Sequence, residues 1–211
     1  MKLSHFYIGR AIVFVLLLFV LAVGYVFFRD TSIKAPNETG NVLEPLVPSA
    51  GLTCNDSPKY FAVEKSLSDS VGSNILIKYK ASTGQKFSCA YLVSEGDFEL
   101  KNVMAEYFLA FTDNFLVLDS GTAPEPRGLI VYDLRSREKV FTDSYAKPVI
   151  VKGDTLEYWA KSDQKPTAEN CPTLAENTKN YLGSVIMSKV SLDLSTLTKK
   201  DTGAFKCLAT Q

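Results

Sequence analysis

The hydrophobic pattern of the chain changes near Tyr60. From there onward, short runs of β-branched and aromatic residues alternate with polar positions and are separated by Gly, Asn, Asp and Ser. This pattern is typical of consecutive antiparallel strands joined by tight turns. We therefore expect an all-β domain over residues 54–211.

Two segments predict β-hairpins with an apolar core. Residues 107–119 and 148–159 each contain two apolar runs, separated by Asp-Asn at 113–114 in the first segment and by Gly-Asp at 153–154 in the second. Asp, Asn and Gly tolerate the backbone conformations that two-residue hairpin turns require. The two-residue separation therefore favours strand, turn and strand in both places.

Three longer phrases, at residues 75–89, 128–142 and 188–202, can be laid over one another, with Tyr79 aligned to Tyr132. Each phrase has an alternating apolar strand, a short polar turn and a return strand that begins with a basic residue. The alternation of these phrases with the hairpins resembles the blade repeat of β-propeller proteins. Three such units are fewer than the usual minimum of about four blades. The resemblance therefore implies antiparallel hairpins that form an incomplete propeller-like domain, and a sandwich is the alternative.

One segment favours a helix instead. Apolar residues recur at helical spacing between Leu100 and Phe111, and Asp97 stands where an N-cap would lie. This spacing allows a short helix over about residues 98–107, but the apolar run from Tyr107 also pairs well with residues 115–119 across the turn at 113–114. We therefore expect one helical turn within residues 98–107, followed by a strand.

An apolar stretch at residues 11–28 contains no charged residue and is flanked by Arg10 and Arg29. As a helix it would span about 27 Å, close to the hydrocarbon core of a bilayer. We interpret it as one N-terminal transmembrane helix, a signal anchor, with residues 1–10 as a cytoplasmic tail. The alternative is a signal peptide cleaved after Gly24, which would leave the domain secreted.

Residues 29–53 contain three prolines and no strand or helix periodicity. We interpret them as a linker that could hold the domain up to about 70 Å from the membrane surface.

All four cysteines follow the apolar stretch, and none lies in a CxxC or CxxH motif. An even number of widely spaced cysteines after an export signal is typical of structural disulfides in an oxidising compartment. Three pairings are open, and we favour the one that is local in sequence. The predicted disulfides are Cys54–Cys89 and Cys171–Cys207, and they place the domain outside the cytoplasm, in the periplasm or at the cell surface.

The chain contains a single histidine, His5, which precedes the apolar stretch. A Ser-His-Asp or Cys-His site and a His-ligated metal site therefore cannot be assembled in the exported domain. Carboxylates at Glu95, Asp97 and Glu99 alternate along the chain, but their spacing matches no dedicated calcium loop. We predict no catalytic residue, no metal, no cofactor and no enzyme activity.

Binding is the remaining class of function. Trp159 and its neighbour Tyr158 lie at a strand end next to a long polar connection, and Pro124 and Arg127 lie in a proline-rich excursion between strands. Exposed aromatic side chains next to polar loops are common in binding hot spots. These four residues are the candidate binding residues, although Trp159 could instead cap the core.

The sequence therefore predicts a membrane-anchored, extracytoplasmic binding or scaffold protein. Its 23 basic and 23 acidic residues give no net charge, which argues against a nucleic-acid partner. The expected partners are the membrane, an unknown protein or glycan ligand, and another copy of the chain through unpaired strand edges. One alternative is an envelope inhibitor that inserts the loop at residues 122–127 into a secreted enzyme. A second alternative is a glycan hydrolase that uses carboxylates such as Glu99 or Asp119.

Overall fold

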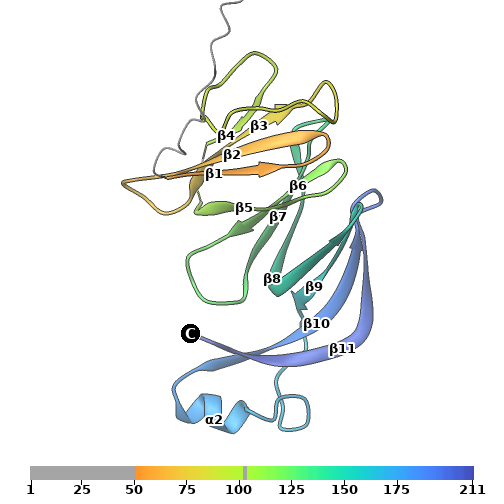
Figure 1. Ribbon diagram of the computed structural model, residues 1–211. Coiled ribbons are helices and arrows are strands. Elements are labelled where there is room, and N and C mark those ends of the chain that lie inside the picture. Colours follow the sequence, from red (N-terminus) through yellow and green to blue (C-terminus); the bar gives the residue numbers. More distant parts are fainter. Residues whose placement is uncertain (1–50, 102–103) are drawn as a thin grey trace, which may run out of the picture. The chain divides into compact units, whose positions relative to one another are not determined.

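The computed structural model describes residues 51–211 except 102–103, and this part of the chain is built of antiparallel β-strands (Figure 1). Four strands form one sheet in the order β1-β2-β3-β4, and seven form a second sheet in the order β11-β10-β9-β8-β7-β6-β5. The predicted all-β class is confirmed. The strands are β1 (Leu52–Asp56), β2 (Tyr60–Ser66), β3 (Ser73–Tyr79), β4 (Phe98–Leu100), β5 (Glu106–Phe111), β6 (Phe115–Ser120), β7 (Arg127–Asp133), β8 (Glu138–Lys152), β9 (Thr155–Lys161), β10 (Gly183–Asp193) and β11 (Thr198–Thr210).

The long strand β8 divides the second sheet into two parts. Its first half pairs with β7 as far as Tyr145, and its second half pairs with β9 from Tyr145 onward, with an irregular register between Ala146 and Ile150. The described chain therefore contains three groups of four strands. We refer to β1–β4 as group 1, to β5–β7 with the first half of β8 as group 2, and to the second half of β8 with β9–β11 as group 3.

The three groups repeat the same local structure. The second strand of each group begins opposite the end of the third strand, in the pairs Tyr60–Tyr79, Phe115–Asp133 and Thr155–Asp193. One residue further on, the same backbone hydrogen bond reaches back to the turn that precedes the second strand: Lys80 N–H to Lys59, Leu134 N–H to Asn114, and Leu194 N–H to Asp154, at 2.9–3.0 Å. These shared bonds define which positions of the three groups correspond.

Corresponding faces of the groups pack onto the next group. Tyr60, Ala62, Ile75 and Ile77 of group 1 form a buried cluster with Leu116, Leu118, Ile130 and Leu134 of group 2. The opposite face of group 2 presents Phe115, Val117, Leu129 and Val131, which cluster with Leu156, Tyr158, Val190 and Leu192 of group 3. Strands β6 and β7 are buried on both faces because each face meets a neighbouring group.

Hydrogen bonds between turns join the groups at one end of the strands, which we call the turn end. Lys59 Nζ donates to the carbonyl of Asp113 at 3.1 Å, and Asn114 Nδ2 donates to Asp154 Oδ2 at 2.7 Å. The opposite end, which we call the loop end, carries the β2–β3, β6–β7 and β9–β10 connections (Figure 1). Gly51 and the C-terminal residue of β11 both lie at the loop end, because Ser66 N–H bonds to Gly51 and Thr210 pairs with Gly183.

Both predicted disulfides are present. Cys54 bonds to Cys89 and Cys171 bonds to Cys207, with sequence separations of 35 and 36 residues. The first ties the β3–β4 connection to β1, and the second ties the β9–β10 connection to β11. Two disulfides are compatible with an extracytoplasmic, oxidising location.

The hairpins predicted at residues 107–119 and 148–159 form as β5–β6 and β8–β9, and Gly153 takes a φ of +57° in the second turn. The phrases at 128–142 and 188–202 also form strand pairs, β7–β8 and β10–β11. In the phrase at 75–89 the predicted return strand is wrong, because residues 80–97 leave the sheet edge and Cys89 is tied to β1. The edge next to β3 is taken instead by β4.

Two further expectations are corrected. Residues 98–100 are the strand β4 and not part of a helix, because Phe98 and Leu100 pair with Ile77 and Ile75 and pack against the cluster between groups 1 and 2. The alignment of Tyr79 with Tyr132 is one residue out of register, since the strand pairs match Tyr79 with Asp133. The described strands form no closed propeller.

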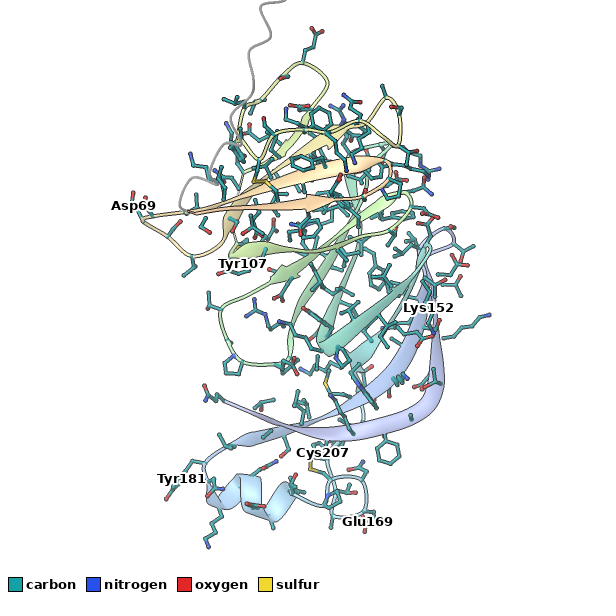
Figure 2. All side chains as sticks on the ribbon, viewed as in Figure 1. Asp69, Tyr107, Lys152, Glu169, Tyr181 and Cys207 are labelled. Atoms are coloured by element: carbon teal, nitrogen blue, oxygen red, sulfur yellow. A yellow bond between two sulfur atoms is a disulfide. The ribbon has the colours of Figure 1, made fainter. Side chains whose placement is uncertain are left out.

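The β9–β10 connection, the long polar connection that follows Trp159, contains the short helix α2 (Leu174–Lys179). Asn177 is buried in it and donates to Ser184 Oγ at 2.8 Å, which fixes the helix against the start of β10. Tyr181 follows α2 and is 98% exposed (Figure 2).

The predicted cytoplasmic tail (1–10), the transmembrane signal anchor (11–28) and the linker as far as residue 50 lie outside the described residues. Within residues 51–101 and 104–211, no helix combines the length and apolar character needed to cross a bilayer.

Candidate functional site

The predicted binding residues Pro124 and Arg127 lie at the loop end, in the β6–β7 connection. Pro124 is exposed at its tip. Arg127 begins β7, and its Nε donates to Asp119 Oδ1 at 2.7 Å while its guanidinium lies 5.8 Å from the centroid of the Tyr107 ring. The hydrogen bond from Arg127 to Asp119 raises the pKa of the guanidinium. Arg127 is therefore held within group 2, and its contacts fix the end of the β6–β7 connection.

Beneath this connection, the side chain of Tyr145 is fully buried. Burial, followed by the negative charge of Asp119, raises the pKa of the Tyr145 hydroxyl. The backbone N–H of Lys147 donates to Glu125 Oε1 at 2.8 Å on the other side of the connection. These contacts hold the exposed residues 122–124 on a rigid base.

The structure places Tyr158 and Trp159 on opposite faces of β9, as expected for neighbours on a strand. Tyr158 is 1% exposed, packs between groups 2 and 3, and donates its hydroxyl to Asp143 Oδ2 at 2.8 Å. Trp159 is half-buried on the outer face of group 3, with Lys206 Nζ 4.8 Å from its ring centroid. Trp159 is therefore the member of the pair that faces away from the other groups.

Of the four carboxylates considered for hydrolysis or calcium, Asp97, Glu99 and Asp119 are engaged with other side chains, and Glu95 is exposed. Asp97 Oδ2 accepts a hydrogen bond from Lys78 Nζ at 2.6 Å, and Glu99 Oε1 accepts one from the Tyr91 hydroxyl at 3.1 Å. Asp119 is paired with Arg127. In the described ranges, no group of three or more His, Cys, Asp and Glu side chains is placed to hold a metal ion.

A hollow that the sequence analysis did not single out lies on the outer face of group 3, at the turn end. It has a volume of about 420 Å³ and is lined by Thr155, Ser191, Asp193, Thr196, Thr198 and Lys200. These residues come from β9, β10, β11 and the β10–β11 turn. The hollow therefore depends on the pairing of all three strands.

The positions of this hollow correspond to positions that are apolar in group 2. Thr155 corresponds to Phe115, because these residues start the second strands opposite Asp193 and Asp133. Ser191 corresponds to Val131, two residues before those aspartates. Phe115 and Val131 pack against group 3, whereas group 3 has no following group among the described strands. The signal was therefore present in the sequence, as polar residues at repeat positions that are elsewhere apolar.

The side chains beside the hollow are paired with one another. Lys152 Nζ donates to Glu157 Oε1 at 2.7 Å, and this hydrogen bond lowers the pKa of Glu157. Lys206 covers the Trp159 ring, as described above. Figure 2 shows Lys152 near the β8–β9 turn, at the rim of this face.

The hollow itself contains polar groups that make no side-chain hydrogen bond or ion pair within the described part of the chain. These are the hydroxyls of Thr155 and Ser191, the ammonium of Lys200 and one carboxylate oxygen of Asp193. The other oxygen of Asp193, Oδ1, accepts hydrogen bonds from the backbone N–H groups of Ser195 at 2.8 Å and Thr196 at 3.2 Å. The turn therefore fixes the Asp193 carboxylate at the lining of the hollow through Oδ1.

Comparison of the chain with protein-family models, with curated proteins and with solved structures found no match, so the site is described from its own geometry.

Proposed function

We propose that the protein is a membrane-anchored, extracytoplasmic binding or scaffold protein that recognises its ligand through the outer face of group 3. One observation carries this proposal: the face that packs onto the next group in groups 1 and 2 is polar, hollowed and uncovered in group 3. Ligand sites are concave, and a few convergent polar groups in them fix the orientation of the ligand.

The proposal includes an arrangement of the three groups. The three groups follow one another as an incomplete propeller-like set, in which the same hydrogen bonds recur and the same faces meet. A ring needs each face to meet a complementary one. The polar face of group 3 lacks that complement, which supports a role in contact with a different molecule.

A site-specific crosslinking experiment tests the proposal in the native envelope. A photoreactive amino acid is placed at Glu157 or Lys189 on the outer face of group 3, in the full-length chain. Matched controls carry it at Thr142 on β8 and at Ser82 in the β3–β4 connection, which are also at the surface. We expect ultraviolet-dependent adducts of one defined size from the two face positions only. Adducts of equal yield from the control positions, or from none of the four, would overturn the proposal.

The predicted compartment is tested separately. Alkylation of the native protein before and after reduction should label no cysteine and then four. Labelling of all four thiols in unreduced protein, together with recovery of the chain in the cytosolic fraction, would contradict the extracytoplasmic assignment.

An inhibitor function is the second candidate, and the β6–β7 connection favours it. Its tip, residues 122–124, is exposed and held by the bonds of Arg127 and Glu125. A loop fixed in one conformation loses little entropy when it enters the cleft of an enzyme. Replacement of residues 123–124 by Gly-Gly should then abolish inhibition of envelope hydrolases while the crosslinks from Glu157 and Lys189 persist.

A further inference from the structure

We infer that the hollow on the outer face of group 3 binds an uncharged saccharide through its hydroxyl groups. This inference rests on the proposed function, because it assigns a ligand class to the same face. The hydrogen-bond donors and acceptors of the hollow belong to its six lining residues: Thr155, Ser191, Asp193, Thr196, Thr198 and Lys200.

The lining matches a ligand that both donates and accepts hydrogen bonds. Four of the six side chains carry hydroxyls, and each hydroxyl can donate one hydrogen bond and accept two. Asp193 adds an acceptor and Lys200 adds a donor. A polyol such as a sugar ring presents the same mixture of donors and acceptors around its edge.

The charges of the lining argue against ionic ligands. Asp193 and Lys200 together contribute no net charge to the hollow. An anion attracted by Lys200 would lie near the Asp193 carboxylate, and a divalent cation would find a single carboxylate next to an ammonium group. An uncharged ligand is repelled neither by the Asp193 carboxylate nor by the Lys200 ammonium group.

The available polar groups are placed by the sheet and not by loops. Thr155, Ser191 and Lys200 lie on three adjacent strands, where Ser191 pairs directly with Lys200 and Thr155 with Asp193. Groups held on paired strands need little reordering when a ligand binds, which favours recognition by several weak hydrogen bonds. The volume of about 420 Å³ lies in the range of small-molecule sites.

The adjoining surface would extend such a site. Trp159 lies on the same face of β9 as Thr155, four residues further along the strand, with Glu157 between them. Its ring is half-buried and is covered by Lys206 at 4.8 Å. A second sugar unit that displaced Lys206 would gain an aromatic surface to stack on. A disaccharide should therefore bind more tightly than its monomer.

The test uses the full-length protein in a zwitterionic detergent, since the headgroups of maltoside detergents are themselves saccharides. The probes are glucose, galactose, N-acetylglucosamine and their β-1,4-linked disaccharides, and binding is followed by saturation-transfer NMR and by titration. Inorganic phosphate and calcium chloride serve as charged probes. We expect saturable binding of at least one neutral saccharide and none of either ion.

Variants locate the binding in the hollow. Ser191→Trp fills the hollow and should lower the affinity at least tenfold, whereas Thr142→Trp on β8 is the matched control and should leave it unchanged. Lys200→Ala and Thr198→Val each remove one hydrogen-bonding group and should lower the affinity about two- to tenfold, and their small size keeps the test valid if Ser191→Trp fails to fold.

Absence of saccharide binding, preference for either ion, or affinity unaffected by Lys200→Ala and Thr198→Val would overturn the inference. If adducts still formed from Glu157 and Lys189 in the crosslinking experiment, a binding function of the face would stand with another ligand. If both experiments failed, the proposed function would fail as well.

Discussion

The outer faces of groups 1 and 3 are the two ends of the series of groups, and they differ in chemistry. The outer face of group 1 is apolar: Phe61, Val63 and Leu76 are buried beneath the β3–β4 connection, with Phe87 and Tyr91 packed on them. The outer face of group 3 carries Thr155, Glu157, Lys189 and Ser191, which are partly exposed. In repeat proteins, terminal units need a solvent-compatible outer face. Group 1 meets that need because the β3–β4 connection covers its outer face. Group 3 meets it because the residues of its outer face are polar.

The difference shows which end is available for binding. The cover of group 1 is fastened by the Cys54–Cys89 disulfide and by Lys78, whose Nζ donates to the Leu92 carbonyl at 2.8 Å and to Asp97 at 2.6 Å. Removing it would expose apolar core. The face of group 3 requires no cover, and its hollow is open.

Removing each disulfide in turn distinguishes two contributions to stability. One is the closure of a covalent loop, and the other is the covering of the outer face of group 1. The sequence separations of 35 and 36 residues predict nearly equal losses of about 4 kcal/mol from the chain-entropy model. Cys54→Ser/Cys89→Ser should lose more than Cys171→Ser/Cys207→Ser, because only the first releases the cover over Phe61 and Leu76. Urea denaturation measures both losses, and binding of an apolar dye should rise for the first variant alone. Equal losses would show that the β3–β4 connection is no cover.

The ion pair between Lys78 and Asp97 under the β3–β4 connection should contribute more to the free energy of unfolding than the charge of Lys200 on the outer face of group 3. Lys78→Ala leaves the Asp97 carboxylate, whose side chain is 10% exposed, without its cation. We expect a loss of about 3 kcal/mol in the free energy of unfolding. The matched substitution at the other end, Lys200→Ala, should change it by less than about 0.5 kcal/mol, as is usual at exposed positions. Similar losses of unfolding free energy from Lys78→Ala and Lys200→Ala would contradict the proposed difference between the outer faces of groups 1 and 3.

The contact between groups 2 and 3 should contribute a pH-dependent part of the free energy of unfolding, through Asp154. Burial raises the pKa of Asp154, but hydrogen bonds from Thr112 and Asn114 outweigh it and hold the pKa below the ordinary value of 3.8. The ionised form therefore stabilises the folded state fully above pH 3.8, and this contribution is lost as the pH falls below that value.

Asp154→Asn should cost about 1–3 kcal/mol at pH 7, because the new amide presents a donor to the donor of Asn114. The difference in unfolding free energy between Asp154→Asn and the parent protein should be smaller at pH 3, because the parent protein then loses the contribution of the ionised carboxylate. Chemical denaturation at both pH values checks this, and a difference that grew on acidification would refute the assignment.

Restoring an apolar face to group 3 should change association and not stability. Lys189→Leu/Ser191→Val makes two outer-face positions resemble their counterparts in group 2. We expect more self-association than in the parent protein by sedimentation velocity, with the free energy of unfolding unchanged within about 0.5 kcal/mol. The control Lys179→Leu/Thr178→Val adds similar apolar surface on α2, away from this face. Equal association by the control would mean that the effect is not specific to the end face.

Local patterns predicted much of this fold. The turns at residues 113–114 and 153–154 and the strands beside them follow from alternation and turn residues, and the disulfide pairing follows from proximity in sequence. The β3–β4 connection was not predictable, because Lys86–Cys89 reads as a strand but is drawn across the outer face by the bond to Cys54. The helix expected at residues 98–107 was also wrong, since tertiary pairing of Leu100 with Ile75 overrides its helical spacing.

The candidate site was less accessible to prediction from sequence. Tyr158 and Trp159 were singled out together, but only packing decides that Tyr158 enters the core. The alignment of the phrases at 128–142 and 188–202 already matched Ser191 with Val131, and the one-residue error at Tyr79 concerned group 1 alone. Polar residues on a strand are ordinary in isolation. They become informative only when the equivalent positions of another group are known to be buried.

The two disulfides have a mechanical consequence. Tension applied between Gly51 and Thr210 would pass from Cys54 to Cys89 and from Cys171 to Cys207 through their sulfur atoms. The covalent loops 54–89 and 171–207, which contain β2, β3 and β10, would therefore bear no load while the disulfides are intact. In a pulling experiment the released length should come from residues 90–170, and a reducing agent should add the residues of both loops to it.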